Sequence, residues 1–142
     1  MIDKKDARKL LIRLERLRKS RLQPCFTEIG LTLGQGLARI LESLAARDHI
    51  TQKELADICH MDVTTMSRSL DRLEESGYLT RQRDPSCRRS FLICLTEEGI
   101  AEAAKVRQIL EALDEQIWMG FSPEEMDMVC AGLERICKNL ED

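Results

Sequence analysis

The sequence predicts a mainly α-helical fold with a small β-hairpin, and three observations indicate this class. Apolar residues recur at helical spacing in most of the chain. Residues 50–96 instead combine two short helical patterns with a strand-turn-strand pattern whose turn is basic. Long helical patterns with one apolar face flank this stretch on both sides. At 142 residues, the chain is long enough for one domain with a core of its own.

The N-terminal part predicts two helices. Residues 3–22 form the first, with Leu10, Leu14 and Leu17 on one stripe and basic residues over much of the rest. That stripe is narrow and lacks Trp and Phe, which argues against a helix that lies on a membrane. We expect the helix to break at residues 23–25, which include Pro24. The second helix spans residues 31–48, with Thr32 as its candidate N-cap and with Gly34 and Gly36 disfavouring a regular start; its core face is Leu37, Ile40, Leu41 and Leu44. Residues 49–50 are then a candidate short strand.

The first of the two short helices begins at Thr51, which with Glu54 forms a capping box: each side chain bonds an amide of the other's residue. Leu55, Ala56 and Ile58 share its apolar face. The pattern stops at residues 59–61, and Asp62 provides the next N-cap. Two helices joined by so short a turn must cross steeply, as in a helix-turn-helix.

The second short helix has Met66, Leu70 and Leu73 as its buried stripe and Gly77 as its C-terminal stop. Its other face carries short hydroxyl side chains followed by arginines, which suits close approach to a major groove. An ordinary solvated helix face would have the same composition. The candidate residues on this face are Thr64, Thr65, Ser67, Arg68 and Arg72.

Two strands follow, at residues 78–83 and 90–95, around a turn at residues 84–89. Between residues 78 and 93 there are four arginines, against the single acid Asp84; they are Arg81, Arg83, Arg88 and Arg89. A protruding guanidinium pair beside such a helix can enter the minor groove or hold phosphates. The whole stretch therefore predicts a winged helix-turn-helix that binds duplex DNA.

The segment ELADICHMDVTTMSRSLDRLEESGYLTRQRDPSCRRSFLICLTEEG closely resembles the core of the MarR-type (multiple antibiotic resistance regulator) family, with its motifs in the same order. The resemblance implies that Arg89 enters the minor groove. The family usually has an Asp before the arginine pair, where it braces the second arginine, whereas this chain has Cys87. Asp84 is a candidate substitute for that Asp. On this model Thr64, Thr65, Ser67 and Arg68 read bases, and Arg72, Arg81, Arg83 and Arg88 mainly contact phosphates.

After the wing, a long helix reaches residue 117, and Ser122 with Glu125 forms a capping box that starts the last helix. The apolar stripe of this last helix is Met126, Val129, Leu133, Ile136 and Leu140. The resemblance implies that the terminal helices intertwine between two subunits, and their one-sided apolar faces agree. We therefore expect a homodimer with a helical dimerisation region at 1–22 and 97–142 and a DNA-binding lobe at 31–96. Its operator would be a pseudo-palindrome with half-sites about ten base pairs apart.

Charge and composition narrow the function. The net charge is −3 and the pI about 5.5, which argues against indiscriminate nucleic-acid binding. No apolar run has the length of a membrane span and no secretory signal is present, so a cytoplasmic location is expected and the six cysteines are expected as thiols. The sequence has no phosphate loop or acid/base set typical of an enzyme, and no cofactor is expected. His49, His60 and Cys59 do not form a metal site at ligand spacing.

The regulating signal stays open. The resemblance implies a repressor released by a small aromatic or lipophilic effector, bound near parts of residues 10–44 and 100–117. One alternative is release by thiol oxidation, with Cys25 as the candidate because it lies among basic residues. The tyrosines that accompany the reactive cysteine in peroxide-sensing relatives are absent, since the only tyrosine is Tyr78. The other alternative is a winged-helix module that binds proteins and no longer binds DNA.

Overall fold

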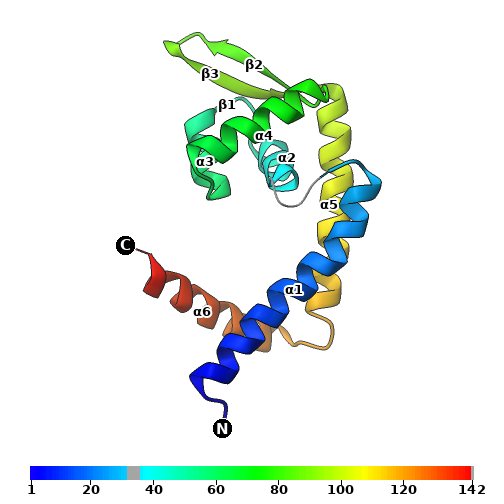
Figure 1. Ribbon diagram of the computed structural model, residues 1–142, viewed down its shortest axis with the longest axis vertical. Coiled ribbons are helices and arrows are strands. Elements are labelled where there is room, and N and C mark those ends of the chain that lie inside the picture. Colours follow the sequence, from blue (N-terminus) through cyan, green and yellow to red (C-terminus); the bar gives the residue numbers. More distant parts are fainter. Residues whose placement is uncertain (32–35, 142) are drawn as a thin grey trace. The chain divides into compact units, whose positions relative to one another are not determined.

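The computed structural model describes residues 1–31 and 36–141, and these form two compact units, Met1–Leu110 and Glu111–Asp142. The first unit contains α1 (Lys4–Glu28), α2 (Leu37–Ala46), α3 (Gln52–Cys59), α4 (Val63–Glu75) and a three-stranded antiparallel sheet. Figure 1 shows the sheet lying beside α3 and α4. The fold is mainly helical with a small β wing, as predicted. None of the helices that the structure describes combines the length and apolar composition needed to cross a bilayer.

The predicted break at residues 23–25 is wrong, because α1 continues through Pro24 to Glu28. A proline inside a helix costs about 3 kcal/mol. Leu22 and Phe26 lie one turn apart on either side of it and are only 4% and 1% exposed. Burying two such side chains contributes about 3–6 kcal/mol, which is enough to keep the last turn helical.

The second helix, α2, begins at Leu37 after Gly36, whose φ is 66°. The predicted cap Thr32 and the predicted irregularity at Gly34 lie outside the described residues. A Cβ on Gly36 would meet the Met61 side chain at 1.9 Å, so glycine lets the start of α2 pack against the turn between α3 and α4. The four predicted core residues of α2 are confirmed as buried: Leu37, Ile40, Leu41 and Leu44.

The cap of α3 is confirmed only in part. The Glu54 amide donates to Thr51 Oγ1 at 3.1 Å, as predicted. The Glu54 carboxylate instead accepts the Thr51 hydroxyl at 3.1 Å and pairs with Arg47 at 3.0 Å, so the predicted bond to the Thr51 amide is replaced. Ile58 was predicted on the apolar face but is 42% exposed, and Cys59 is buried in its place. Leu55 and Cys59, one turn apart, face the core, since Cys59 Sγ lies 3.4 Å from Ser43 Oγ of α2.

The wing consists of β2 (Leu79–Asp84) and β3 (Cys87–Leu95), and β1 (Ile50–Thr51) pairs with the other edge of β3. The predicted short strand before α3 is therefore confirmed at Ile50, which pairs with Ile93. The predicted turn at residues 84–89 is too long, because Asp84 already pairs with Cys87. The register shifts between Arg83, which pairs with Phe91, and Asp84. Arg88 and Arg89 thus belong to an irregular part of β3 and not to a loop.

The helix α5 (Glu97–Ile117) starts in the first unit and extends into the second. Thr96 ties its start to the end of α4, because the Thr96 hydroxyl donates to the Gly77 carbonyl at 2.6 Å and accepts the Gly99 amide at 3.0 Å. In the second unit, Trp118 and Phe121 pack edge to face with their ring centroids 5.4 Å apart. The capping box of Ser122 and Glu125 is confirmed at the start of α6 (Pro123–Leu140), and no residue of α6 is buried.

Candidate nucleic-acid interface

The helix α4 is fixed on one side by the core and left open on the other. Met66, Leu70 and Leu73 are at most 1% exposed, as the sequence predicted, and Ser69 is buried with them. Asp62 caps the helix by accepting the amide and the hydroxyl of Thr65, at 2.8 and 2.9 Å. These bonds hold the pKa of the Asp62 carboxyl below its usual value. The predicted reading face is accessible: Thr64, Arg68 and Arg72 are exposed, and Thr65 and Ser67 are half-buried.

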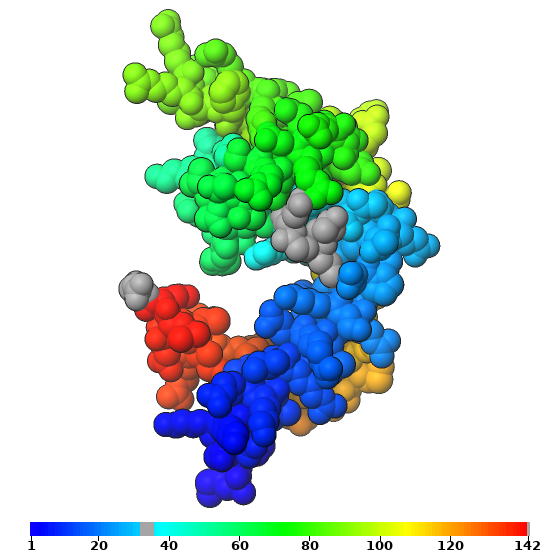
Figure 2. All heavy atoms as spheres, in the orientation of Figure 1, coloured from blue at the N-terminus to red at the C-terminus, as the bar shows by residue number. Residues whose placement is uncertain are grey.

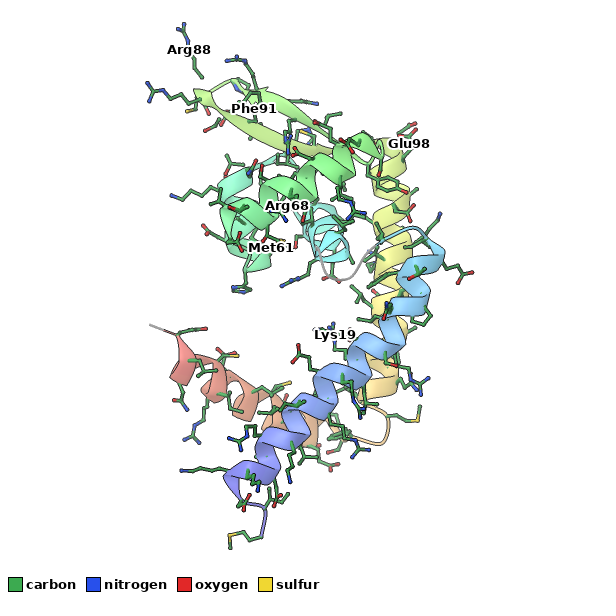
Figure 3. All side chains as sticks on the ribbon, in the orientation of Figure 1. Lys19, Met61, Arg68, Arg88, Phe91 and Glu98 are labelled. Carbon is green, nitrogen blue, oxygen red and sulfur yellow. The ribbon has the colours of Figure 1, made fainter. Side chains whose placement is uncertain are left out.

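The wing presents its arginines in different ways. Figure 2 shows the wing projecting from the body of the first unit. Arg88 and Arg89 are exposed, and Arg88 extends from the tip into open space (Figure 3). Arg83 donates through Nη1 to the Arg88 carbonyl at 3.2 Å and lies over the Phe91 ring, 5.7 Å from its centroid. Arg83 thus fixes the irregular part of β3 while its own charge stays near the surface.

Arg81 is placed differently from the other wing arginines. Its Nη1 lies 3.0 Å from Asp71 Oδ1 and 3.5 Å from Glu74 Oε1, both on α4. Its side chain is only 23% exposed. The guanidinium therefore links β2 to the exposed side of α4 and has its charge balanced by two carboxylates.

Cys87 stands at the start of β3, directly before the two adjacent arginines of the wing. It is exposed, and the Ser90 hydroxyl donates to its Sγ at 3.5 Å. This bond and the neighbouring amides lower the pKa of the Cys87 thiol. Asp84 accepts the amide and hydroxyl of Ser86 at 2.9 and 2.7 Å, so its carboxylate closes the turn. Both bonds use the same carboxylate oxygen, Oδ1, and the role of Asp84 as a brace for Arg89 stays a prediction.

Two further predictions concern a redox-active thiol and metal binding. Cys25 is exposed on α1, and its thiol donates to the Arg21 carbonyl at 3.7 Å. Within residues 1–31 and 36–141, no three His, Cys, Asp or Glu side chains gather as metal ligands would.

Lys53 was missed by the sequence analysis. It lies on the first turn of α3 and lines the same hollow as Arg89 of the wing. Only the pairing of β1 with β3 brings these two residues together, because they are far apart in the sequence. Had the strand prediction at residues 49–50 been followed through to its partner strand, Lys53 would have been placed beside the wing.

A helix-turn-helix with an open polar helix face, joined to a basic wing, defines the class of winged helix-turn-helix proteins. A model of the MarR family matches residues 33–91. The chain is 31% identical, over 118 residues, to the uncharacterized HTH-type transcriptional regulator YybA of Bacillus subtilis, covering 82% of this chain and 76% of that protein.

Solved structures agree with this match. The crystal structure of the transcriptional regulator SlyA superposes with a TM-score of 0.83 at 27% identity, covering 95% of this chain and 94% of that one. A putative MarR family regulator from Listeria monocytogenes, complexed with 26mer DNA, has a TM-score of 0.82 at 25% identity, covering 99% and 90%. The chain belongs to the MarR family. It is a transcription regulator and not an enzyme.

Proposed function

We propose that the protein is a homodimeric repressor that binds a pseudo-palindromic operator and leaves it when a small effector binds. The observation that carries this proposal is the open face of α4 beside the basic wing, held in place by the buried stripe of the same helix. The putative regulator from Listeria monocytogenes, whose fold this chain shares, was crystallised in complex with 26mer DNA. That likeness and the geometry of α4 support the proposal that this chain binds an operator.

The residues of α4 and the wing divide into three roles. Thr64, Ser67 and Arg68 would read base edges in the major groove. Thr65 would read bases as an acceptor, because its hydroxyl proton is already donated to Asp62. Arg89 would enter the minor groove, and Arg72, Arg83 and Arg88 would hold phosphates. The two carboxylates around Arg81 support a bracing role for that residue, in place of the phosphate contact that the sequence suggested.

Two exposed apolar stripes support the homodimer. On α1, Leu10, Leu14 and Leu17 are 46–51% exposed. On α6, the five stripe residues named above are 39–80% exposed, and the whole helix buries no residue in its own chain. Burying a large apolar side chain contributes about 1.5–3 kcal/mol, so covering both stripes with a second copy would be strongly favourable. A two-fold dimer would place its recognition helices about 34 Å apart, one turn of DNA.

Release by an effector is supported by a hollow and by a rigid junction in the first unit. The hollow has a volume of about 390 Å³ and lies among α2, β3 and α5, and it overlaps the predicted region at Leu44 and at residues 100–107. Its walls are mostly apolar, which suits a small aromatic or lipophilic molecule; they include Leu44, Leu95, Ile100 and Ala103. The bonds of Thr96 to Gly77 and Gly99 join α5 to the end of α4. A ligand that displaces α5 would thus move α4 and change the spacing of the two recognition helices.

The DNA-binding proposal is tested by titrating the chain's own upstream duplex at several salt concentrations. Wild type should bind tightly, with affinity falling steeply as salt rises, because bound phosphates release counterions. Arg89→Ala should weaken binding by about 5- to 150-fold for each half-site, which corresponds to a groove contact worth about 1–3 kcal/mol. Arg135→Ala, which removes the same charge from exposed α6, is the matched control and should bind as wild type does. If selection from random duplexes enriches no sequence, the repressor proposal fails and a protein-interaction module takes its place.

The dimer is tested by placing a charge in the α6 stripe. Leu133→Arg should give a monomer in sedimentation experiments and should abolish tight operator binding, because one half-site alone retains little affinity. Met128→Arg is the matched control, since Met128 is 76% exposed and lies off the stripe. A dimeric Leu133→Arg variant would show that the stripe is not the interface.

A further inference from the structure

One hollow on the first unit is lined by cations and by no acid. It has a volume of about 280 Å³. One wall comes from β1 and the first turn of α3, and the other from the irregular part of β3. We call it the Lys53–Arg89 hollow, and its lining residues are Thr51, Gln52, Lys53, Arg89, Ser90 and Phe91.

The two walls of the hollow begin at one strand pair, Thr51 of β1 and Leu92 of β3. The residues that follow Thr51 form one wall, and the residues that precede Leu92 form the other. Because the register shifts between Arg83, which pairs with Phe91, and Asp84, which pairs with Cys87, residues 88–90 of β3 have no partner in the β2 register. Arg89 belongs to this stretch, and it lines the same hollow as Lys53.

The charge of this hollow differs from that of the other hollows described. Four larger hollows each include at least one carboxylate among their lining residues, for example Glu15, Asp114, Asp48 and Asp57. The acids nearest in sequence to the Lys53–Arg89 hollow do not line it and have partners of their own. The Glu54 carboxylate pairs with Arg47 and accepts the hydroxyl of Thr51, and Asp84 bonds Ser86. Two like charges that share a hollow without a counter-charge repel each other, and a bound anion would remove that repulsion.

Hydrogen-bond donors surround the same hollow. The first amides of any helix have no carbonyl partner within the helix. In α3 the Thr51 hydroxyl accepts the amide of Glu54, which leaves the amides of Gln52 and Lys53, on the turn that lines the hollow, with no such cap. The positive end of the helix dipole adds to the charges of the two side chains. Lys53 is exposed, so its ammonium can contact an anion that enters the hollow from solvent.

We propose that the Lys53–Arg89 hollow binds one phosphate group of the DNA backbone, with Lys53 as its main ligand and Arg89 on the facing wall. This inference rests on the proposed operator binding and adds a contact outside α4 and the wing tip. A phosphate bound between α3 and β3 would fix the distance between the wing and the DNA duplex. Arg89, from the same hollow, would then continue past the backbone into the groove.

The test compares Lys53→Gln with Lys138→Gln, the same change on exposed α6, by operator titrations across salt. Lys53→Gln removes one phosphate contact from each subunit of the dimer, so the slope of log affinity against log salt should fall by about 1.8, which corresponds to a roughly 60-fold weaker affinity at 0.1 M salt. The bases selected should stay the same, because phosphate contacts carry no sequence information. The control should match wild type in slope and affinity.

A duplex series with one neutral methylphosphonate at each backbone position in turn then identifies the contact. At one position in each half-site, the modification should weaken wild type but leave Lys53→Gln unaffected, because the variant no longer uses that phosphate. If Lys53→Gln keeps the wild-type salt slope, or loses affinity equally on every modified duplex, the inference is overturned while operator binding stands. If wild type selects no duplex at all, the proposed function fails and the inference fails with it.

A final arm separates the backbone from a free anion. Inorganic phosphate is added at constant ionic strength while binding of the unmodified duplex is followed. The expected result is no effect beyond that of chloride, because an isolated phosphate lacks the other contacts of the duplex. Displacement of the duplex from wild type but not from Lys53→Gln would mean that free phosphate competes with the duplex for the hollow, and would also support the assignment of the hollow to the backbone.

Discussion

Gly99 on the first turn of α5 allows the closest approach between that helix and the end of the recognition helix. A Cβ at this position would lie 1.8 Å from the Tyr78 carbonyl oxygen and 2.8 Å from its carbon. An ordinary carbon–oxygen contact needs about 3.3 Å, so Gly99→Ala must push the two backbones apart by about 1.5 Å. The Tyr78 carbonyl accepts the Thr96 amide at 3.1 Å, and that bond would be strained or lost.

The cost follows from these contacts. Overpacking of this kind costs about 1–3 kcal/mol, and weakening the bonds of Thr96 to Tyr78 and Gly77 adds about 2 kcal/mol. The better helix propensity of alanine offsets about 1 kcal/mol. Gly99→Ala should therefore lower the free energy of unfolding by about 2–4 kcal/mol. At about 4 °C per kcal/mol for a chain of this size, the Tm should fall by about 8–16 °C.

The assay is thermal and urea unfolding at a single protein concentration, because a dimer's apparent stability depends on concentration. Gly132→Ala is the control, since no atom lies within 4 Å of its added Cβ in the same chain. It should leave stability unchanged or raise it by up to about 1 kcal/mol, as alanine does inside a helix. A Tm for Gly99→Ala within about 2 °C of wild type would refute the close approach of α5 to Tyr78.

Three further predictions concern single contacts. Thr96→Val removes the hydroxyl that bonds Gly77 and Gly99 and should cost about 1–2 kcal/mol in urea unfolding, whereas an unchanged midpoint would show that α5 starts without this cap. Because the folded pKa of Asp62 lies below 3.8, its cap stabilises the protein above that pH and is lost as pH falls through the folded pKa; acid titration of Asp62→Asn should lack this component, and parallel wild-type and variant curves would contradict it. Cys87 should react with iodoacetamide near neutral pH well before Cys94, whose thiol is buried and has a raised pKa, and peptide mapping that finds the reverse order would count against the Ser90 bond.

Features that depend on residues a few positions apart were predicted well. The caps at Thr51, Asp62 and Ser122 each join residues three apart, and all three accept the expected amide. The buried stripe of α4 is equally local, because one turn of helix sets its spacing. Such signals need no knowledge of the partner surface, so the sequence alone contains them.

The wrong predictions arise where distant packing decides. Pro24 is a strong local signal for a helix end, but the burial of Leu22 and Phe26 outweighs it, and nothing nearby in the sequence announces that burial. The turn of the wing was placed too broadly because Arg88 and Arg89 fit a loop as well as a strand. The bonds from Ser86 to Asp84 close the chain within two residues and let β3 begin at Cys87.

The candidate interface shows the same division. The exposed and buried faces of α4 follow from its helical period, so the reading face could be chosen from sequence. The pairing of Arg81 with Asp71 and Glu74 could not, because it depends on how β2 lies against α4. Lys53 likewise acquires its neighbours only through the pairing of β1 with β3.

The order of the strands also has a consequence for folding. In the sheet β1-β3-β2 the central strand is the last to be synthesised. Ile50 of β1 can therefore form its strand pair only after Ile93 has been synthesised. The His49 amide donates to the Ile93 carbonyl, and the Leu95 amide donates to the Asp48 carboxylate. The C-terminal end of β3 thus holds the residues that lead into α3. Contacts of such high sequence separation slow folding, because a long loop must close before they form. A fragment that ends before Cys87 would have both helices of the helix-turn-helix without the strand that holds their entrance, so the shortest autonomous DNA-binding piece of this chain has to include β3.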